Sequence, residues 1–579
     1  MRTIKMMFGV FERKQKIQLL WLIIAILVGA VVELVSISSV LPFVEMVTDP
    51  AAMMEDKYIR IVSGITGVTD FETLVILMCG LIIALFVIKN IYVVFLSNFQ
   101  YRFTYYGLRD LSSKVMNGYM EKSYPFFLNH NSAELLKSVQ TDTNMFYVTV
   151  LNGTQLISEC VVACSLVVYL VIQDPVIAIS MAVVLGLFAV GFMSGFRKAF
   201  KRMGNEYRVY VENQIKCMHQ SFGGIKEIKI SDNEQFFKDQ FWDIAAGLAR
   251  NQVKNGLYNA IPKPMMETMV IGVVLVIVAV KTASGNAASS FIPIITVFAL
   301  AAFRLLPSVN KISSYVGVIM YNKVAVEAVY NEITEMKGNL EKSEKTEEEA
   351  IEFDKSIDLN DVVFAYDGAE KNVIDHVSLS IKKNTSVAFI GPSGAGKTTI
   401  VDVMLGILKN QSGTITVDGM DIRNAMSGWH KKIGYIPQVI YLMDDTIRNN
   451  IAFGIKPELI SDEKVWKALE EAQLKDFVEK LEDGLDTMVG ELGTRLSGGQ
   501  RQRIGIARAL YRQPEVLVLD EATSALDNET EKAVMEAIDN LHGKLTLIII
   551  AHRLTTIKNC DVVYEIKDGK VEEKELELN

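Results

Sequence analysis

Hydrophobic positions are distributed unevenly along the chain. Up to about Met320, long apolar runs alternate with polar stretches, whereas the remainder has the mixed pattern of a soluble α/β protein. A helix that crosses a bilayer needs about 20 mainly apolar residues. Six runs are long enough, at approximately 18–44, 72–98, 147–172, 175–197, 257–281 and 288–320. The pattern therefore predicts six membrane-spanning helices followed by a soluble domain.

The basic residues between these runs predict the orientation in the membrane. Lys and Arg concentrate at the N-terminus and in the polar segments 100–145 and 198–256, whereas the loop 45–70 has five acids against Lys57 and Arg60. Loops rich in Lys and Arg stay in the cytoplasm. We therefore expect a multi-pass protein of the inner (plasma) membrane, with both termini and the soluble domain cytoplasmic.

The two polar segments have helical periodicity, and they predict helices that project beyond the membrane. Each turns near a short element, around 129–136 in the first segment and 221–228 in the second. Long polar connections of this kind usually have a function. We expect the two short elements to contact the soluble domain, although solvated loops are the alternative.

A highly charged stretch, KGNLEKSEKTEEEAIEFDKSID at 337–358, separates the two halves and reads as a solvated linker. The expected domains are 1–336 for the membrane half, 337–358 for the linker and 359–579 for the soluble half. The expected fold class is an all-α domain of six spanning helices with long cytoplasmic extensions, followed by an α/β domain. A net charge of −9 offers no basic field, so no nucleic-acid partner is expected.

The strongest chemical signal is the sequence GPSGAGKTT at 391–399. It matches GxxxxGK[ST], follows a β-rich apolar run and opens a helix-like stretch, which is the context of a phosphate-binding loop. Backbone N–H groups of such a loop surround phosphate, Lys397 reaches the β- and γ-phosphates, and Thr398 binds Mg²⁺. The motif therefore predicts ATP and Mg²⁺ as ligands. The loop residues expected to bind nucleotide are Gly391, Ser393, Gly394, Gly396, Lys397, Thr398 and Thr399.

A second apolar strand, at 516–520, ends in two adjacent acids. Asp520 stands where an acid holds Mg²⁺ beside a phosphate loop, and Glu521 stands where a carboxylate orients and polarises the attacking water.

A second anion-binding turn, LSGGQ at 496–500, opens another helix-like stretch. One nucleotide needs only one phosphate loop, so this turn predicts that two subunits share each nucleotide. Its expected nucleotide-binding residues are Ser497, Gly498, Gly499 and Gln500.

With this set of motifs the chain resembles an ABC transporter of the exporter type, a half-transporter with one membrane half and one ATPase half. The resemblance covers nearly the whole chain in domain order. It implies a dimer of two identical subunits, in which ATP binding closes the ATPase halves and opens the helices outward, and hydrolysis resets them.

The resemblance also implies roles for single residues. Tyr366 would stack on adenine, Gln438 would contact Mg²⁺ and the attacking water, and Glu491 would contact the coupling loops. Ser497 and Gly499 would reach the γ-phosphate held by the other subunit. Glu521 would be the catalytic base, Asp527 would lie at the dimer seam, and His552 would contact the γ-phosphate.

Six ionisable residues interrupt the apolar runs, namely Glu33, Lys89, Glu159, Lys263, Glu267 and Arg304. Each costs a few kcal/mol at the bilayer centre. Some could snorkel or pair, as Lys263 and Glu267 could at a spacing of four. Three bases on three separate runs are nevertheless many for a cavity that handles neutral compounds. We hypothesise that Lys89, Lys263 and Arg304 face a central cavity and contact an anionic headgroup.

Three short stretches, at 33–42, 223–230 and 303–310, resemble bacterial flippases for lipid-linked oligosaccharides. This resemblance implies a polyprenyl-pyrophosphate-linked oligosaccharide, or a similar anionic lipid, as substrate. A multidrug, lipid A-like lipid or peptide exporter is the alternative. From a different class, an ATP-gated channel stays open, whereas ATPases that act on DNA or ribosomes are excluded by the six apolar runs.

Overall fold

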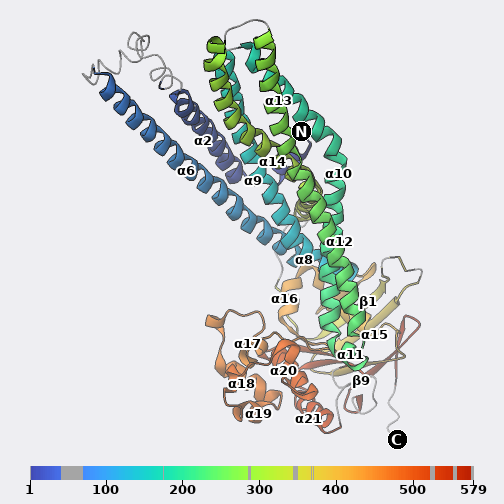
Figure 1. Ribbon diagram of the computed structural model, residues 1–579. Helices are drawn as coiled ribbons and strands as arrows, with labels where there is room; N and C mark the ends of the chain where they lie inside the picture. The colour runs from blue at the N-terminus through green and yellow to red at the C-terminus, as the bar shows by residue number, and fades with distance from the viewer. Residues whose placement is uncertain are drawn as a thin grey trace. The chain divides into compact units, whose positions relative to one another are not determined.

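A computed structural model of the protein describes residues 2–40, 43, 70–173, 175–283, 288–342, 350–366, 368–369, 371–521, 528–551 and 557–574 (Figure 1). Side chains in parts of the helices between 170 and 305 are also outside the described set. The chain separates into two compact units. One consists of 1–122 and 126–343, and the other of 123–125 and 344–579.

The first unit is helical. Its elements are α1 (Arg2–Val10), α2 (Arg13–Ser38), α6 (Phe71–Met120), α7 (Tyr124–Asn129, from residue 126 onward), α8 (Ser132–Lys137), η1 (Ser138–Asp142), α9 (Thr143–Gln173), α10 (Pro175–Gly223), α11 (Ile225–Ile230), α12 (Glu234–Ala260), α13 (Pro262–Ala283) and α14 (Ala288–Lys342). The element η1 is a π-helical turn, in which the N–H of Thr143 bonds the carbonyl of Ser138. Within the described residues, three stretches are long and apolar enough to cross a membrane: Arg13–Ser36, Phe71–Met120 and Ser132–Tyr169. The other predicted spans fall on α10, α13 and α14, which carry side chains outside the described set, and they stay predictions.

The helices extend far beyond the predicted spans. With 50 residues, α6 is about 75 Å long, against a hydrocarbon core of about 30 Å. Its N-terminus is fixed by Asp70, which accepts hydrogen bonds from the N–H and the hydroxyl of Thr73. Along the spanning part, side chains such as Ile83, Ile91 and Val94 are more than 60% exposed, as a lipid-facing surface requires.

The helices of the first unit pack through a core between α1, α2, α6, α9 and α14. Leu22, Phe146, Val326 and Val329 are fully buried in it. Elsewhere α10 and α14 approach so closely that a Cβ placed on Gly204 would lie 1.9 Å from the carbonyl oxygen of Tyr321. Only glycine allows this crossing.

The second unit contains two β-sheets. The four-stranded antiparallel sheet has the order β2-β1-β4-β5, and the six-stranded sheet has the order β10-β9-β3-β8-β7-β6. In the larger sheet β6, β7, β8, β3 and β9 are parallel and β10 is antiparallel. Every residue of β7 and β8 is buried, which explains their unbroken apolar sequences.

The bounds of these strands are β1 (Ser356–Phe364), β2 (Ile374–Lys382), β3 (Ser386–Ile390), β4 (Ser412–Val417), β5 (Met420–Asp421), β6 (Ile433–Ile436), β7 (Val516–Asp520), β8 (Thr546–Ile550), β9 (Val562–Lys567) and β10 (Lys570–Glu573). The α-helices of the unit are α15 (Lys397–Met404), α16 (Met426–Lys431), α17 (Ile447–Ile451), α18 (Asp462–Glu471), α19 (Lys475–Glu479), α20 (Gly498–Tyr511) and α21 (Asn528–Asp539). Because the carboxyl ends of the parallel strands meet at one edge, residues just after β3, β6 and β7 are brought together there.

Candidate functional site

The phosphate-binding sequence forms the loop between β3 and α15. Gly391, Gly394 and Gly396 have φ angles of 146°, 81° and 100°, which favour glycine. A Cβ on Gly391 would lie 2.4 Å from the carbonyl oxygen of Ile566, so a side chain is also excluded there by space. The loop thus wraps the N-terminus of α15, where backbone N–H groups and the helix dipole favour an anion.

Lys397, the first residue of α15, is 5% exposed. Its Nζ donates hydrogen bonds to the carbonyl oxygens of Gly391 (3.0 Å) and Pro392 (3.1 Å), so the ammonium lies over the loop. Burial lowers the pKa of Lys397, although the charges of Glu521 and Asp520 oppose this shift. The ammonium is therefore a buried cation on the loop, suited to bind phosphate oxygens.

Thr398 and Asp520 lie next to each other beside the loop. The Thr398 hydroxyl donates to Asp520 Oδ1 at 3.4 Å, and the Tyr435 hydroxyl donates to the other carboxylate oxygen at 3.4 Å. Burial, together with the charge of Glu521, raises the pKa of Asp520. A divalent cation would favour the ionised form, because it supplies the positive charge that this buried carboxylate lacks.

Hard oxygen donors of this kind fit Mg²⁺, which binds one or two carboxylates together with phosphate oxygens and water. Among the described residues, no group of three His, Cys, Asp or Glu side chains forms an all-protein metal site. A phosphate-dependent Mg²⁺ site does not require such a group. When bound, Mg²⁺ would supply neutralising charge to the phosphates.

Gln438 and Glu521 meet at the ends of two neighbouring strands, β6 and β7. Gln438 Nε2 donates to Glu521 Oε2 at 2.7 Å. Glu521 has a φ of 47°, a strained conformation for a residue other than glycine. Such strain clusters at functional sites. The pair therefore places an amide and a carboxylate close to Asp520, where an attacking water would be oriented.

Tyr366 also lies near the phosphate loop. Its hydroxyl is 3.2 Å from Thr399 Oγ1, and its ring packs edge-on against Phe364 with 5.1 Å between centroids. The ring is 41% exposed, so it has a free face for stacking.

The second anion-binding turn is a well-formed helix N-terminus. Ser497 Oγ accepts from the Gln500 N–H at 3.2 Å, and Gln500 Oε1 accepts from the Ser497 N–H at 2.8 Å. This capping box fixes the start of α20. Glu491 lies on an exposed 3₁₀ turn between Gly490 and Gly493, whose φ angles are both positive. Asp527 and His552 fall outside the described residues.

Comparisons with known proteins identify the family of this chain. The ABC transporter family profile matches residues 374–524, and the ABC transporter transmembrane region matches 19–306. An ATP-dependent lipid A-core flippase of Vibrio vulnificus is 31% identical over 475 residues, which cover 79% of this chain and 78% of the relative. The flippase of the same description in Francisella novicida is 33% identical over 68% of this chain and 66% of that protein. This chain is an ABC transporter.

The transporter also has a solved structural neighbour, a bacterial Atm1-family ABC exporter with ATP bound. The TM-score is 0.75, with 21% identity, over 96% of this chain and 94% of the neighbour. The expected family and fold class, a helical membrane domain fused to an α/β ATPase domain, are confirmed. ATP hydrolysis coupled to transport and the location in a membrane follow from the family. The roles of single residues and the domain bounds stay predictions.

The candidate cargo residues in the spanning part of the transporter differ from one another in exposure and contacts. Lys89 is half-buried, with its ammonium 5.0 Å from the ring centroid of Phe86, whereas Lys263 is exposed. No ion pair joins Lys263 to Glu267, both of which are described. The side chain of Arg304 falls outside the described set. Glu159 is paired, because it accepts from Lys311 Nζ at 2.7 Å and from the Ser308 hydroxyl at 2.9 Å.

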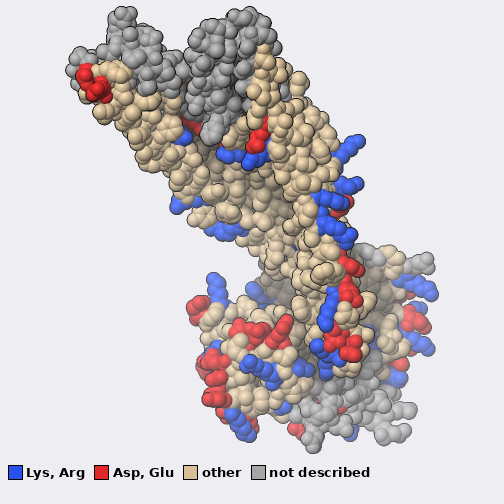
Figure 2. Space-filling model, viewed as in Figure 1, with Lys and Arg blue, Asp and Glu red and all other residues tan. Residues whose placement is uncertain are grey.

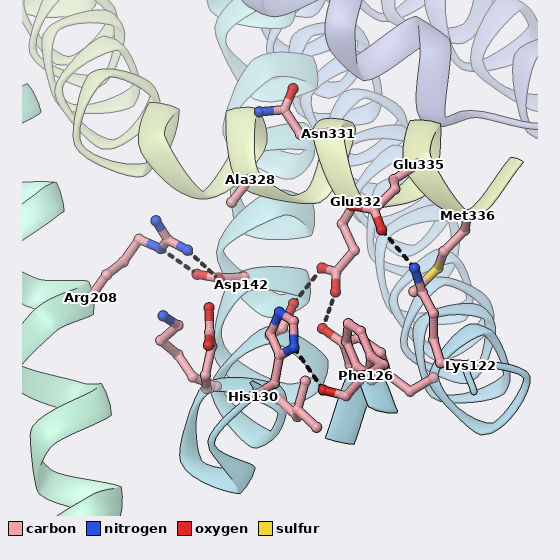
Figure 3. A pocket seen from close by; sticks show the side chains of 15 residues that line it. Lys122, Phe126, His130, Asp142, Arg208, Ala328, Asn331, Glu332, Glu335 and Met336 are labelled. Atoms are coloured by element: carbon pink, nitrogen blue, oxygen red, sulfur yellow. Dashed lines mark hydrogen bonds and ion pairs between the residues drawn. The ribbon is translucent and has the colours of Figure 1, made fainter. Parts of the chain in front are cut away.

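A polar pocket of about 240 Å³ in the first unit has no counterpart in the sequence predictions (Figure 3). We call it the Glu332 pocket. Its lining residues come from α6, α7, α8, η1, α10, α14 and the short connections after α6 and α7, and they include Lys122, His130, Asp142, Arg208 and Glu332. Arg208 donates to both carboxylate oxygens of Asp142, at 2.7 and 2.6 Å. Glu332 accepts from the hydroxyls of Tyr119 and Ser138.

Burial, with a smaller effect of Glu335, raises the pKa of Glu332 to about 7. The pocket adjoins the first predicted contact element, which the structure forms as α7 and α8. The polar residues of the Glu332 pocket lie in segments whose sequence predicts only polar helices. No local sequence motif therefore identifies them.

Proposed function

We propose that this transporter flips a phosphate-bearing glycolipid from the cytoplasmic to the outer leaflet by alternating access, as a dimer of two identical subunits. The observation that carries the proposal is the pairing of Thr398 with Asp520 and of Gln438 with Glu521, in a chain whose relatives include ATP-dependent lipid A-core flippases. Basic residues in the spanning part, Lys89 and Lys263 among them, support an anionic substrate.

In the proposed hydrolysis step, Lys397 and the loop glycines hold the β- and γ-phosphates. Glu521 accepts the proton of the attacking water, and Gln438, already bonded to Glu521, orients that water. Thr398 and Asp520 would hold Mg²⁺, and His552 would contact the γ-phosphate. Tyr366 would stack on the adenine.

The dimer follows from the second anion-binding turn. Ser497 caps α20 and Gly499 lies in its first turn, an arrangement that suits a phosphate, whereas the loop at 391–399 suffices for the phosphates of one nucleotide. Each ATP would then lie between the loop of one subunit and the Ser497 turn of the other, with Asp527 at the seam. ATP binding thus closes the dimer, and Glu491 transmits the closure to the coupling elements.

The names of the relatives favour a lipid A-like substrate over a polyprenyl-pyrophosphate-linked oligosaccharide. Both substrates present phosphate and sugar above apolar chains, so the same basic residues would serve either. The relatives named above are described as lipid flippases and not as multidrug exporters. We therefore place the lipid A-like glycolipid first and keep the polyprenyl substrate as the second candidate.

The test is ATP-dependent flipping in proteoliposomes of the full-length protein, with a lipid A-type glycolipid and a polyprenyl-pyrophosphate glycan supplied in parallel. The variant Lys89→Gln/Lys263→Gln/Arg304→Gln should lose flipping and keep basal ATPase activity. The matched control, Arg197→Gln/Lys198→Gln/Lys201→Gln, removes three exposed bases from α10 and should keep both. Unchanged flipping in the first variant would refute the basic cargo site, and ATPase stimulation by hydrophobic drugs alone would favour multidrug export.

A further inference from the structure

A second pocket of the membrane unit lies between the first turns of α2 and the part of α6 that follows its spanning run. It has a volume of about 640 Å³ and is lined by residues between 12 and 18 and between 99 and 110. We call it the Lys14–Arg102 pocket. Since the adjoining spans are predicted at 18–44 and 72–98, the pocket lies at the level where the bilayer meets water.

The aromatic residues around the pocket agree with this level. Tyr101, Tyr105 and Tyr106 are exposed by 46%, 61% and 57%, on a stretch of α6 directly after its apolar run. Tyrosine is enriched at membrane–water interfaces, where its ring faces the lipid and its hydroxyl the water. On the face drawn in Figure 2, the limb formed by α2 and α6 is tan over most of its length, and Lys and Arg gather on its lower part.

Among the described residues, two of the cations that line the pocket have no anionic partner. Asp110 is paired with Arg109 (2.6 Å), and Glu12 with Lys114 (2.8 Å). Lys14 and Arg102 are both exposed, and neither has a hydrogen bond or an ion pair among the residues that the structure describes. Two like charges that share one pocket repel each other, so an anion between them would stabilise both.

Two aromatic side chains, Phe99 and Phe103, also line the pocket and give it an apolar wall. Phe103 is 6% exposed and packs edge-on against Phe11, with 5.9 Å between ring centroids, and Phe99 is half-buried beside it. A soluble anion needs no apolar wall beside its binding site. A phospholipid does, because its glycerol and the first part of its acyl chains continue from the phosphate toward the bilayer interior.

We propose that the Lys14–Arg102 pocket binds the phosphate of an anionic phospholipid in the leaflet on which residues 12–18 and 99–110 lie. Under the orientation proposed above, this is the cytoplasmic leaflet. The guanidinium of Arg102 binds the two free oxygens of the phosphodiester, and the Lys14 ammonium shares one of them. The site lies outside the ATPase machinery and apart from the candidate cargo residues, so the bound lipid is a resident ligand of the transporter.

The experiment is native mass spectrometry of the delipidated full-length protein, titrated with phosphatidylglycerol in the absence of nucleotide and cargo. The variant Lys14→Gln/Arg102→Gln should weaken the tightest lipid site about thirtyfold, the order expected when two basic contacts at a membrane surface are lost. Arg13→Gln/Lys16→Gln removes two exposed bases from the same turn of α2 without touching the pocket, and should leave that site unchanged. Arg102→Lys should keep part of the affinity, since it retains the charge but not the planar fork.

Equal losses in the two double variants would overturn the proposal in favour of general surface charge. Equal binding of zwitterionic phosphatidylcholine, which has the same phosphodiester, would overturn the requirement for an anionic lipid, and displacement of the lipid by inorganic phosphate would show a site for the free anion. Basal ATPase activity, measured for every variant, reports that the proteins are folded. Because no cargo is present, a wrong cargo assignment would leave the lipid titration unaffected.

Discussion

The ion pair between Asp142 and Arg208 gives a quantitative test of how the Glu332 pocket is held together. The guanidinium binds both carboxylate oxygens, and the side chains are 1% and 17% exposed for Asp142 and Arg208. Asp142 is thus a nearly inaccessible carboxylate with one cation partner among the described contacts. The pKa of Arg208 is raised despite its burial, because the bonds to Asp142 and the charges of Asp142, Glu212 and Glu134 favour the cation.

The two halves of the pair should therefore respond differently to mutation. Arg208→Met leaves a buried carboxylate without its partner and should cost about 3–5 kcal/mol of unfolding free energy. Asp142→Asn leaves a guanidinium that Glu212 and Glu134 still attract, and should cost only about 1–3 kcal/mol. The double variant should cost about 2 kcal/mol less than the sum of the two, because neither partner is then left charged and alone.

The assay is denaturant unfolding of the detergent-solubilised protein at neutral pH, followed by helix circular dichroism. The control is Arg202→Met, since the pair of Arg202 with Glu206 is 3.3 Å long and 73% and 43% exposed. That variant should change the unfolding free energy by less than about 0.5 kcal/mol. A cost for Arg208→Met no greater than for the control, or strict additivity in the double variant, would refute the assignment of a buried, mutually dependent pair.

Three further predictions concern Glu332, Glu521 and Gly204. Glu332 has its pKa raised from 4.5 to about 7, so it stays protonated in the folded protein while it ionises in the unfolded chain, and stability falls as the pH rises from about 4.5 to 7. Glu332→Gln should remove this loss of stability, which amounts to at most about 3 kcal/mol. The melting temperature of the variant relative to wild type should therefore be higher at pH 8 than at pH 5. The same difference at both pH values would contradict the raised pKa of Glu332. Glu521→Gln should keep ATP binding and trap a closed, ATP-bound dimer on size-exclusion chromatography, whereas turnover near the wild-type rate would exclude Glu521 as the base. Gly204→Ala should lower the melting temperature by several degrees, because its Cβ meets the backbone of Tyr321, and Gly195→Ala, with open space around it, is the matched control.

The ATPase site is the part that the sequence predicts best, for a physical reason. Its chemistry lies in short local motifs, and parallel strands bring their carboxyl ends to one edge whatever the rest of the chain does. The proximity of Thr398 to Asp520, and of Gln438 to Glu521, follows from strand order alone. The left-handed φ of Glu521 could not be predicted, because it depends on how the chain leaves β7.

The transmembrane unit shows the opposite case. The apolar runs predict where helices cross the bilayer, and the polar periodicity predicts that they continue beyond it, but no signal within 100–145 predicts that α6 ends at Met120. Contacts across the Glu332 pocket join residues far apart in the chain, such as Tyr119 and Glu332, which are 213 positions apart. Their pairing depends on the lengths and rotations of several long helices. Locally each of these residues resembles an ordinary solvated side chain, so no sequence pattern separates it from its neighbours.

The π-helical turn η1 determines the directions in which the side chains of α8 and α9 point relative to each other. Residues five positions apart on an α-helix point about 140° apart, so Lys137 and Asp142 would face different neighbours. A turn closed by bonds over five residues brings them nearly above one another, and they meet Glu212 and Arg208, which lie four apart on one side of α10. The extra residue of the π-helical turn therefore rotates the helix so that Lys137 and Asp142 both face α10, where they pair with Glu212 and Arg208. Deleting the exposed Gln140 should restore α-helical pitch, and cysteine cross-linking between positions 137 and 212 should then lose its efficiency while the helix itself persists.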